Sequence, residues 1–211
     1  MDAYDWADLI EIFDRAALIT DPTSKYVINA VAAHNRAIDD AIIAAALATA
    51  YGGRDGTTTY SFPTSTHQIA HGSKGLDLTK LLTAKEILDS YENDPDEPRF
   101  FILNAKQVTN LLNTTEIKSA DYNTVKALAA GQIDTFLGFK FIRSERLQKV
   151  STTRSCLAFS KNSLLLGIGT DIITRVSERA DKNYATQVYV GMFIGATRMD
   201  EKGVVEVQAT E

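Results

Sequence analysis

The chain has 211 residues, of which 45% are hydrophobic and 23% are charged, and these values are typical of a globular protein. Its formal net charge of −5 argues against tight sequence-independent binding to nucleic acid, which relies on lysine and arginine. The only cysteine, Cys156, excludes an intrachain disulfide and a metal site built from several cysteines. Length and composition predict one large domain or two small ones.

The N-terminus does not resemble a secretion signal, because Asp2, Asp5 and Asp8 stand where such a segment is basic. The longest apolar run, residues 41–48, is too short to span a bilayer. We therefore expect a protein that is made in a reducing cytoplasm and has no membrane partner.

The first twenty residues alternate in a way that predicts an extended strand with Trp6 on its packed side. The apolar residues of one parity are Tyr4, Trp6, Ile10 and Ile12. Acidic residues recur at every third position, as Asp2, Asp5, Asp8, Glu11 and Asp14. Two interpretations stay open: the acids form a solvated face, or the segment is a charged arm that docks on a basic patch of a neighbouring copy.

A long helix is predicted from about Pro22 to Ala50. Asp21 is a suitable N-cap, and Pro22 suits the first helical position, where a missing N–H costs nothing. One apolar stripe at steps of three and four consists of Val27, Val31, His34, Ile38, Ile42 and Ala45. About 28 helical residues would span roughly 42 Å, far more than the average helix of ~11–12 residues. We expect this helix to act as a strut.

Residues 56–75 are rich in Thr, Ser and Gly, a composition that also suits a flexible linker. The threonines are β-branched and interleave with Tyr60, Phe62 and Ile69, so the segment is predicted to form an exposed ribbon.

From Asp77 onward, helices and strands alternate. Helices are predicted over 77–91, 104–112 and 121–131, the second of them opened by a capping box of Asn104 and Gln107. Strands are predicted over 99–103, 133–143, 155–159, 172–179 and 184–198. A further strand over 204–208 is predicted to form a hairpin with the one before it, across Met199–Gly203.

The sequence proposes no catalytic, cofactor or metal site. His67 and His71 are four residues apart, but Gln68 stands where a zinc protease has glutamate, and the neighbouring composition is not helical. His34 is expected to be a core or interface group rather than a ligand. The glycines of Gly167-Ile168-Gly169 lack the third glycine and the following helix of a dinucleotide-binding turn. Cys156 lies in an apolar run and is expected to be buried.

Several segments resemble, in the expected order, the major capsid proteins of tailed bacteriophages. They are YDWADLIEIFD (4–14), DPTSKYVINAVAAHNRAIDDAIIAAAL (21–47), DPDEPRFFIL (94–103), DYNTVKALAAGQIDTFLGFKFIRSER (121–146) and ERADKNYATQVYVGMFIGATR (178–198). The resemblance covers most of the chain. It implies an α+β fold, the Johnson fold, with a long spine helix, a peripheral P-domain and an axial α/β A-domain.

The family plan implies an E-loop remnant over 1–20, a P-domain over 21–75 and 180–211, and an A-domain over 76–179. It also implies an N-terminal arm and an outgoing E-loop strand ahead of residue 1, which this sequence lacks. The chain is therefore expected to be N-terminally truncated, and its strand at about residues 4–13 to lack its outgoing E-loop partner and to present an unpaired edge.

The resemblance implies a structural coat protein whose partners are other copies of itself in hexamers and pentamers. A scaffolding protein is a further candidate partner, and packaged double-stranded DNA would be contacted only non-specifically. Candidate contact residues are Trp6, Asp8, Glu11, Asp14, Arg15, Arg143, Arg146 and Arg198. Two alternatives are a nanocompartment shell protein of the same fold and a small α/β enzyme.

Overall fold

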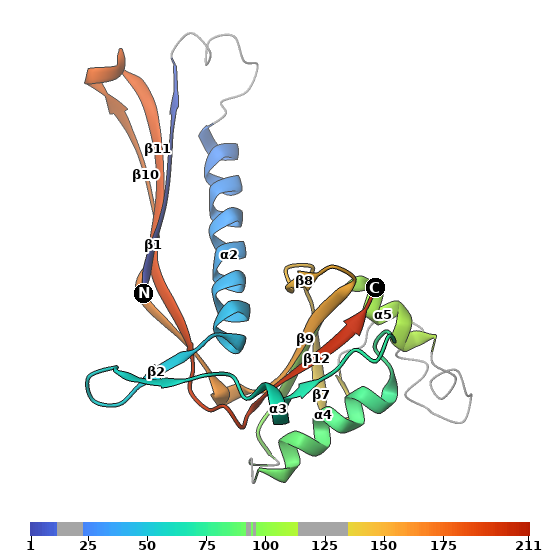
Figure 1. The fold of residues 1–211 in the computed structure, drawn as a ribbon. Coiled ribbons are helices and arrows are strands. Elements are labelled where there is room, and N and C mark those ends of the chain that lie inside the picture. Colours follow the sequence, from blue (N-terminus) through green and yellow to red (C-terminus); the bar gives the residue numbers. More distant parts are fainter. Residues whose placement is uncertain (12–22, 92–93, 95, 114–134) are drawn as a thin grey trace. The chain divides into compact units, whose positions relative to one another are not determined.

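The structure is a computed structural model that describes residues 1–11, 23–91, 94, 96–113 and 135–211 (Figure 1). These residues form two compact units. The first comprises Met1–Ile42 and Leu166–Ala196, and the second comprises Ile43–Leu165 and Thr197–Glu211. The helix predicted over 121–131, the predicted N-cap Asp21 and the contact candidates Asp14 and Arg15 lie outside the described residues.

The first unit contains a three-stranded sheet in the order β1 (Asp2–Ile10), β11 (Ala185–Arg198), β10 (Leu164–Arg179). A short helix, η2 (Ala180–Lys182), joins β10 to β11. β1 runs antiparallel to β11, from Asp2 opposite Ile194 to Ile10 opposite Thr186. β1 therefore has a strand partner on one side, in β11, and it remains an edge strand on the other side. Alternation predicts the strand, but it cannot show that the strand pairs with β11, a segment far away in the sequence.

One face of this sheet is buried. Tyr4 of β1 lies opposite the buried Met192 of β11, and Trp6 lies opposite the buried Val190. Trp6 stacks on Tyr26 of α2 (Thr23–Leu47), with ring centroids 6.2 Å apart. Trp6 thus lies on the packed side, as the sequence predicts.

The predicted strut helix is confirmed as α2, one continuous helix of 25 residues. Ala30 and His34 of its inner stripe are buried. His34 donates from Nδ1 to the Ala30 carbonyl oxygen over 2.9 Å, which identifies it as a packed core residue. The helix ends before Ala50 because Ala50 and Tyr51 already pair with the strand that follows. None of the helices in the described part of the chain combines the length and hydrophobicity needed to cross a membrane.

The second unit contains a mixed sheet in the order β4-β12-β9-β5-β7-β6, with β8 beside β9. These strands are β4 (Gln68–Ile69), β5 (Arg99–Leu103), β6 (Thr135–Phe136), β7 (Phe139–Arg143), β8 (Lys149–Val150), β9 (Thr153–Ser160) and β12 (Val204–Thr210). β5 and β7 are parallel, as are β12 and β4, whereas the pairs β12–β9, β5–β9, β6–β7 and β8–β9 are antiparallel. A short helix, η1 (Lys161–Ser163), links β9 to β10.

Two helices accompany this sheet, α4 (Leu78–Ser90) and α5 (Ala105–Leu112), close to their predicted bounds. Asn104 caps α5 by accepting from the Gln107 N–H. The Gln107 side chain does not complete the capping box. It accepts instead from the Leu76 N–H over 2.8 Å and ties α5 to another segment. Phe101 lies at the centre of the core, and its ring centroid is 5.8 Å from that of Phe139 and 5.7 Å from that of Phe141.

Two predicted strand connections are wrong. The single strand expected over 133–143 is a hairpin of β6 and β7, because Leu137 and Gly138 adopt positive φ angles of 54° and 85° and reverse the chain. The hairpin expected across Met199–Gly203 does not form either. β12 pairs with β9 and β4, whereas β11 pairs with β1 and β10. The turn residues were recognised, but the two strands that they join belong to different sheets.

The ribbon predicted over 56–75 begins earlier. It consists of the hairpin of β2 (Ala50–Gly52) and β3 (Thr58–Tyr60), seen beside the label β2 in Figure 1, followed by the short helix α3 (Thr64–His67). Tyr51 and Tyr60 are exposed on the hairpin. The threonine-rich segment therefore forms a strand, an exposed turn and a short helix rather than a linker.

A buried ammonium group fixes the loop that follows. Lys80 on α4 is 8% exposed, and its Nζ donates to the carbonyl oxygens of His71, Lys74, Gly75 and Gln208 over 2.9–3.0 Å. Burial is the main cause that lowers the pKa of Lys80. The loop carbonyls thus compensate for the lost hydration of the charge.

Two neighbouring phenylalanines of β5 should contribute unequally to the stability of the fold. Phe101 is fully buried, whereas Phe100 on the opposite face of β5 is half-buried and stacks on Phe159 at 5.6 Å. Phe101→Ala should reduce the free energy of unfolding by about 3–5 kcal/mol, because it leaves a cavity. Phe100→Ala should cost about half as much. Urea unfolding followed by circular dichroism measures both, and equal losses would contradict the described packing.

Candidate assembly surfaces

The two histidines with metal-ligand spacing do not form a site. His67 lies in α3, and its ring stacks on Tyr91 with centroids 4.8 Å apart. Burial lowers the pKa of His67, which favours the neutral ring. His71 lies outside the helix and accepts from the Ser73 N–H. Among the described residues, no group of three or more His, Cys, Asp or Glu side chains is placed to hold a metal ion.

Cys156 is buried in β9, as predicted. Burial raises the pKa of its thiol to about 12, so the thiol stays protonated and unreactive. Gly167 and Gly169 lie inside β10 and not at a strand-to-helix turn, which a dinucleotide-binding site would require.

The N-terminal contact candidates point in different directions. Trp6 and Asp8 share the inward parity of β1, and both are half-buried. Asp8 Oδ1 accepts from the Leu9 N–H over 2.9 Å. Asp5 and Glu11 are exposed. The acidic period of three is therefore divided between the two faces of the strand, so it does not form one charged surface.

The basic candidates also separate. Arg143 and Arg146 are exposed. Arg198, in contrast, is only 4% exposed, and its guanidinium donates to the carbonyl oxygens of Ala46, Ala48 and Tyr60 over 2.8–3.0 Å. It also lies 5.4 Å from the ring centroid of Phe62. The prediction of Arg198 as an assembly contact is corrected: its donors are used within its own chain.

The role of Arg198 follows from the end of α2. The last carbonyl groups of a helix lack partners within the helix and carry partial negative charge. Arg198 donates to one of them, on Ala46, and to the Ala48 carbonyl just after the helix, and joins both to Tyr60 of β3. The guanidinium therefore fixes the base of the β2–β3 hairpin, which carries the exposed Tyr51.

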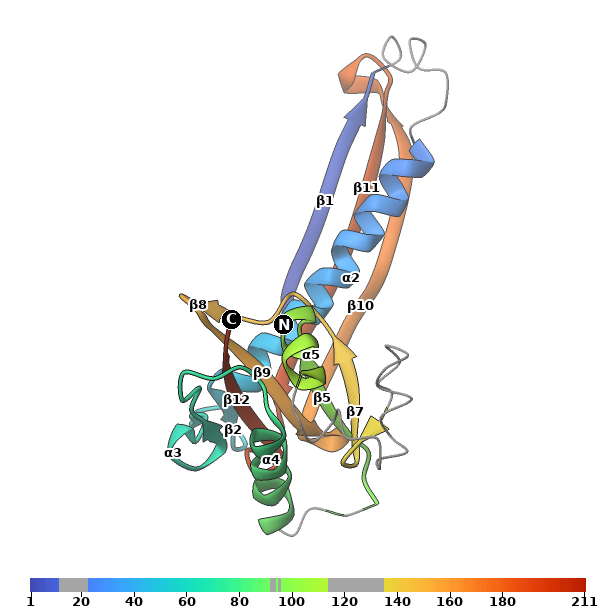
Figure 2. The same ribbon diagram turned by 90° about the vertical axis from the view of Figure 1, so that its right-hand side faces the viewer.

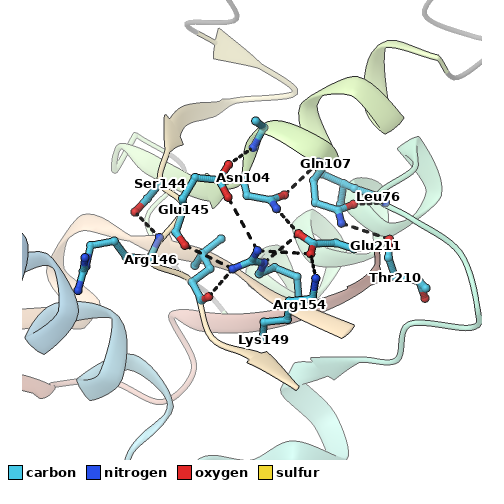
Figure 3. A network of polar contacts seen from close by, with 12 residues as sticks. Leu76, Asn104, Gln107, Ser144, Glu145, Arg146, Lys149, Arg154, Thr210 and Glu211 are labelled. Atoms are coloured by element: carbon cyan, nitrogen blue, oxygen red, sulfur yellow. Dashed lines mark hydrogen bonds and ion pairs between the residues drawn. The ribbon is translucent and has the colours of Figure 1, made fainter. Parts of the chain in front are cut away.

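A network of polar contacts surrounds Glu211, which directly follows β12 (Figure 3). Arg154 of β9 donates from Nε to Glu211 Oε1 over 2.9 Å, and Lys149 lies 2.5 Å from Oε2. Asn104 also donates to Glu211. The hydrogen bonds from Arg154, then that from Lys149, lower the pKa of Glu211 to about 2. This carboxylate joins β9, β8 and the start of α5.

The structure shows exposed features that the sequence analysis missed. A groove of about 350 Å³ lies between the β2–β3 hairpin and residues 197–201. Tyr51, Tyr60 and Met199 on its rim are each about half-exposed or more, and Asp200 and Glu201 add negative charge. Strand β10 exposes Leu165, Ile168, Ile173 and Val176. The sequence predicts only residues 172–179 as a strand, because Gly167 and Gly169 interrupt the strand pattern in the first half of β10.

Comparison with known proteins gives the family. The family model described as phage capsid protein matches residues 1–211, which is the whole chain. No curated protein matches the chain.

Solved structures match the fold over nearly the whole chain. The capsid protein of the cyanophage P-SCSP1u is 18% identical at a TM-score of 0.73, and the match covers 100% of this chain and 72% of that one. A capsid chain of the cyanophage Pam1 is 11% identical at a TM-score of 0.73, covering 99% and 74%. A SrpI encapsulin chain from Synechococcus elongatus is 8% identical at a TM-score of 0.63, covering 99% and 74%. At such low identity these likenesses show the fold alone.

A long helix with a three-stranded sheet, together with a separate mixed sheet, defines the Johnson fold of viral and related shell proteins. The α+β prediction is confirmed. The chain belongs to the phage capsid protein family and is a component of the virion capsid. Members of this family are structural proteins, and the absence of an enzymatic activity in this chain stays a prediction.

The Glu211 network predicts a specific acid sensitivity. The pKa of Glu211 falls from an ordinary value of 4.5 to about 2 on folding. Its contribution to stability is therefore present above about pH 4.5 and is lost as the pH falls toward 2. Glu211→Gln should cost about 1–2 kcal/mol at pH 7 and should flatten the dependence of unfolding free energy on pH in this window.

The matched control is Glu86→Gln on the exposed side of α4. It should leave the pH profile of urea unfolding unchanged. An identical profile for Glu211→Gln and the unmodified chain would contradict the described network.

The Arg198 contacts predict a local effect on the hairpin. Arg198→Lys keeps the charge but replaces the planar set of donors with one ammonium, which cannot reach the same carbonyls together. Amide hydrogen exchange should accelerate about tenfold or more in residues 50–60. Arg175→Lys, at an exposed position, serves as the control. Unchanged exchange in the hairpin of Arg198→Lys would show that the guanidinium does not hold it.

Proposed function

We propose that this chain is the major capsid subunit of a tailed phage or prophage, and that it associates laterally with copies of itself into an icosahedral head shell. The match of the phage capsid family over residues 1–211 carries this proposal. A shell built from one repeated subunit needs several contact surfaces on each copy. The exposed apolar side chains of the β2–β3 hairpin and of β10 supply surfaces of this kind.

We assign each part of the family plan to a segment of the fold, and the boundaries of these segments stay predictions. Residues 21–75 and 180–211 are proposed as the peripheral P-domain, 76–179 as the axial A-domain, and 1–20 as an E-loop remnant. β10 is hydrogen-bonded to β11 in the same sheet as β1, which favours counting most of residues 164–179 with the P-domain. The mixed sheet with α4 and α5 is the proposed body of the A-domain.

The proposed partners are other copies of the chain in hexamers and pentamers. Glu11, Arg143 and Arg146 remain candidate contacts because they are exposed. A scaffolding protein is a further proposed partner during assembly in the host cytoplasm. Packaged DNA would be contacted only non-specifically, since the net charge of −5 gives little attraction to phosphate. No cofactor is proposed.

The nanocompartment alternative is less well supported. An encapsulin chain shares the fold at a TM-score of 0.63, but at 8% identity this likeness carries no function. The family match names phage capsid proteins. For the small α/β enzyme, the described residues offer no group of three or more His, Cys, Asp or Glu side chains that could hold a catalytic metal ion.

Self-association can be measured directly. We expect analytical ultracentrifugation over a wide range of concentrations to show a reversible shift from single copies to rings of five or six and to larger particles. Negative-stain electron microscopy of the heavy fractions should show curved or closed shells. A single sedimenting monomer at every concentration, with no particle in the pellet, would contradict the proposed function.

A further inference from the structure

We infer that the free edge of β10 is a two-fold contact between copies, in which β10 of one copy pairs antiparallel with β10 of another around Ile173. This inference deepens the proposed shell function and rests on it, since it names one surface through which copies associate. The three-stranded sheet has two edges, β1 and β10, and they differ in their side chains.

β10 is hydrogen-bonded to β11 on one side only, which leaves its outer side without a strand neighbour in the described part of the chain. Figure 2 shows β1 and β10 on opposite sides of this sheet, with β11 between them. β10 spans 16 residues and contains neither proline nor lysine, and its charged residues are Asp171, Arg175, Glu178 and Arg179. A long edge without a strand neighbour can pair with a strand of another chain when the side chains of the two strands are complementary.

The side chains of β10 match themselves in one antiparallel register. With Ile173 opposite its own copy, Asp171 lies opposite Arg175, and by symmetry Arg175 lies opposite Asp171. Opposite charges directly across a strand pair stabilise it, and β-branched side chains pack well there. In the same register Thr170 lies opposite Val176, and Ile172 opposite Thr174. The central residues are therefore complementary in charge and shape.

These residues are available for such a contact. Asp171 and Arg175 are exposed, and Ile173 is 41% exposed. Their common parity places their side chains on one face of the strand. Within the described residues, no ion pair involves Arg175, whereas Arg179 is already paired with Asp181 at 2.5 Å. The pairing would therefore give Arg175 a carboxylate partner.

The other edge lacks this complementarity. β1 contains Asp2, Asp5 and Asp8 but no lysine or arginine. An antiparallel β1–β1 pair centred on Asp5 would place Asp5 opposite itself and Asp2 opposite Asp8. Like charges directly opposite each other destabilise a strand pair. Opposite charges therefore match in a β10 pair, whereas β1 has no basic residue that could match its aspartates.

The strand pair alone should be weak. A strand pair of about 13 residues buries less accessible surface than a stable protein complex, which buries about 1,200–2,000 Å². Repetition over a closed shell would make such modest contacts sufficient. A test must therefore trap the contact, and cysteine cross-linking does so.

The central variant is Ile173→Cys. Directly opposite residues in an antiparallel pair have Cα atoms about 4.5–5.5 Å apart, within reach of a disulfide. Two copies of Ile173→Cys should therefore form a covalent dimer under mild oxidation, observed on a non-reducing gel. The unmodified chain is a clean background, because Cys156 is buried.

The matched control is Ile168→Cys on the same strand. Ile168 is more exposed than Ile173, 54% against 41%, so random collisions would favour the control. In the proposed register the two copies of residue 168 are about 33 Å apart, which forbids a disulfide. We expect at least about tenfold less dimer from Ile168→Cys than from Ile173→Cys. Equal yields would overturn the proposal.

A charge exchange tests the register. In the Ile173→Cys background, Asp171→Arg or Arg175→Asp alone places like charges opposite each other twice and should lower the dimer yield about tenfold. The double variant Asp171→Arg with Arg175→Asp restores opposite charges and should restore the yield. Failure of the double variant to recover would overturn the proposal. So would a mixed disulfide between Ile173→Cys and an Ala7→Cys copy at the level of the Ile173→Cys dimer, because it would show that β1 is the partner.

The assay is run on soluble protein and on any particles, so the inference and the proposed function can fail separately. Shells without the Ile173→Cys dimer would overturn the inference and leave the shell function intact. The dimer with its charge dependence, in the absence of rings and shells at all concentrations, would support the strand contact and contradict the proposed function.

Discussion

A three-stranded sheet satisfies the backbone of only its central strand on both sides, and this constraint governs the first unit. β11 occupies the centre, with β1 and β10 as its neighbours. Val188, Val190 and Met192 of β11 turn their side chains to the buried face. The outer backbone groups of β1 and β10 have no strand partner within this sheet. A protein that must join many copies of itself can use such an edge, whereas a monomeric protein has to protect it.

The second unit uses buried charges to fix segments that make little core of their own. Arg198 binds the carbonyl end of α2 and the base of the β2–β3 hairpin, and Lys80 binds the loop before α4. Glu211 binds the side chains of Arg154 and Lys149. Each of these groups is surrounded by several hydrogen-bonding partners, which compensates for its removal from water. Exposed loops and ribbons are thereby held in defined positions, as repeated lateral contacts between copies require.

Local patterns in the sequence predicted the elements well but not their partners. Period-two alternation located β1 and β11, and the apolar stripe located α2, because these signals depend only on neighbouring residues. The 133–143 segment was misjudged because its alternation continues through a turn in which Leu137 takes a positive φ. Arg198 looked like a surface charge, since no local pattern reveals that distant carbonyl groups surround it. The sequence shows Asp171 and Arg175 four residues apart, but it does not show that β10 is an edge strand. Only an edge strand can bring these two residues opposite each other in a pair with its own copy.

The most direct measurement is a cryo-electron microscopy reconstruction of the particle that contains this chain. We predict a closed icosahedral shell in which this chain is the repeating unit of every pentamer and hexamer. A particle whose shell is built from another protein, with this chain at a few positions or absent, would contradict the central claim that it is the major capsid subunit.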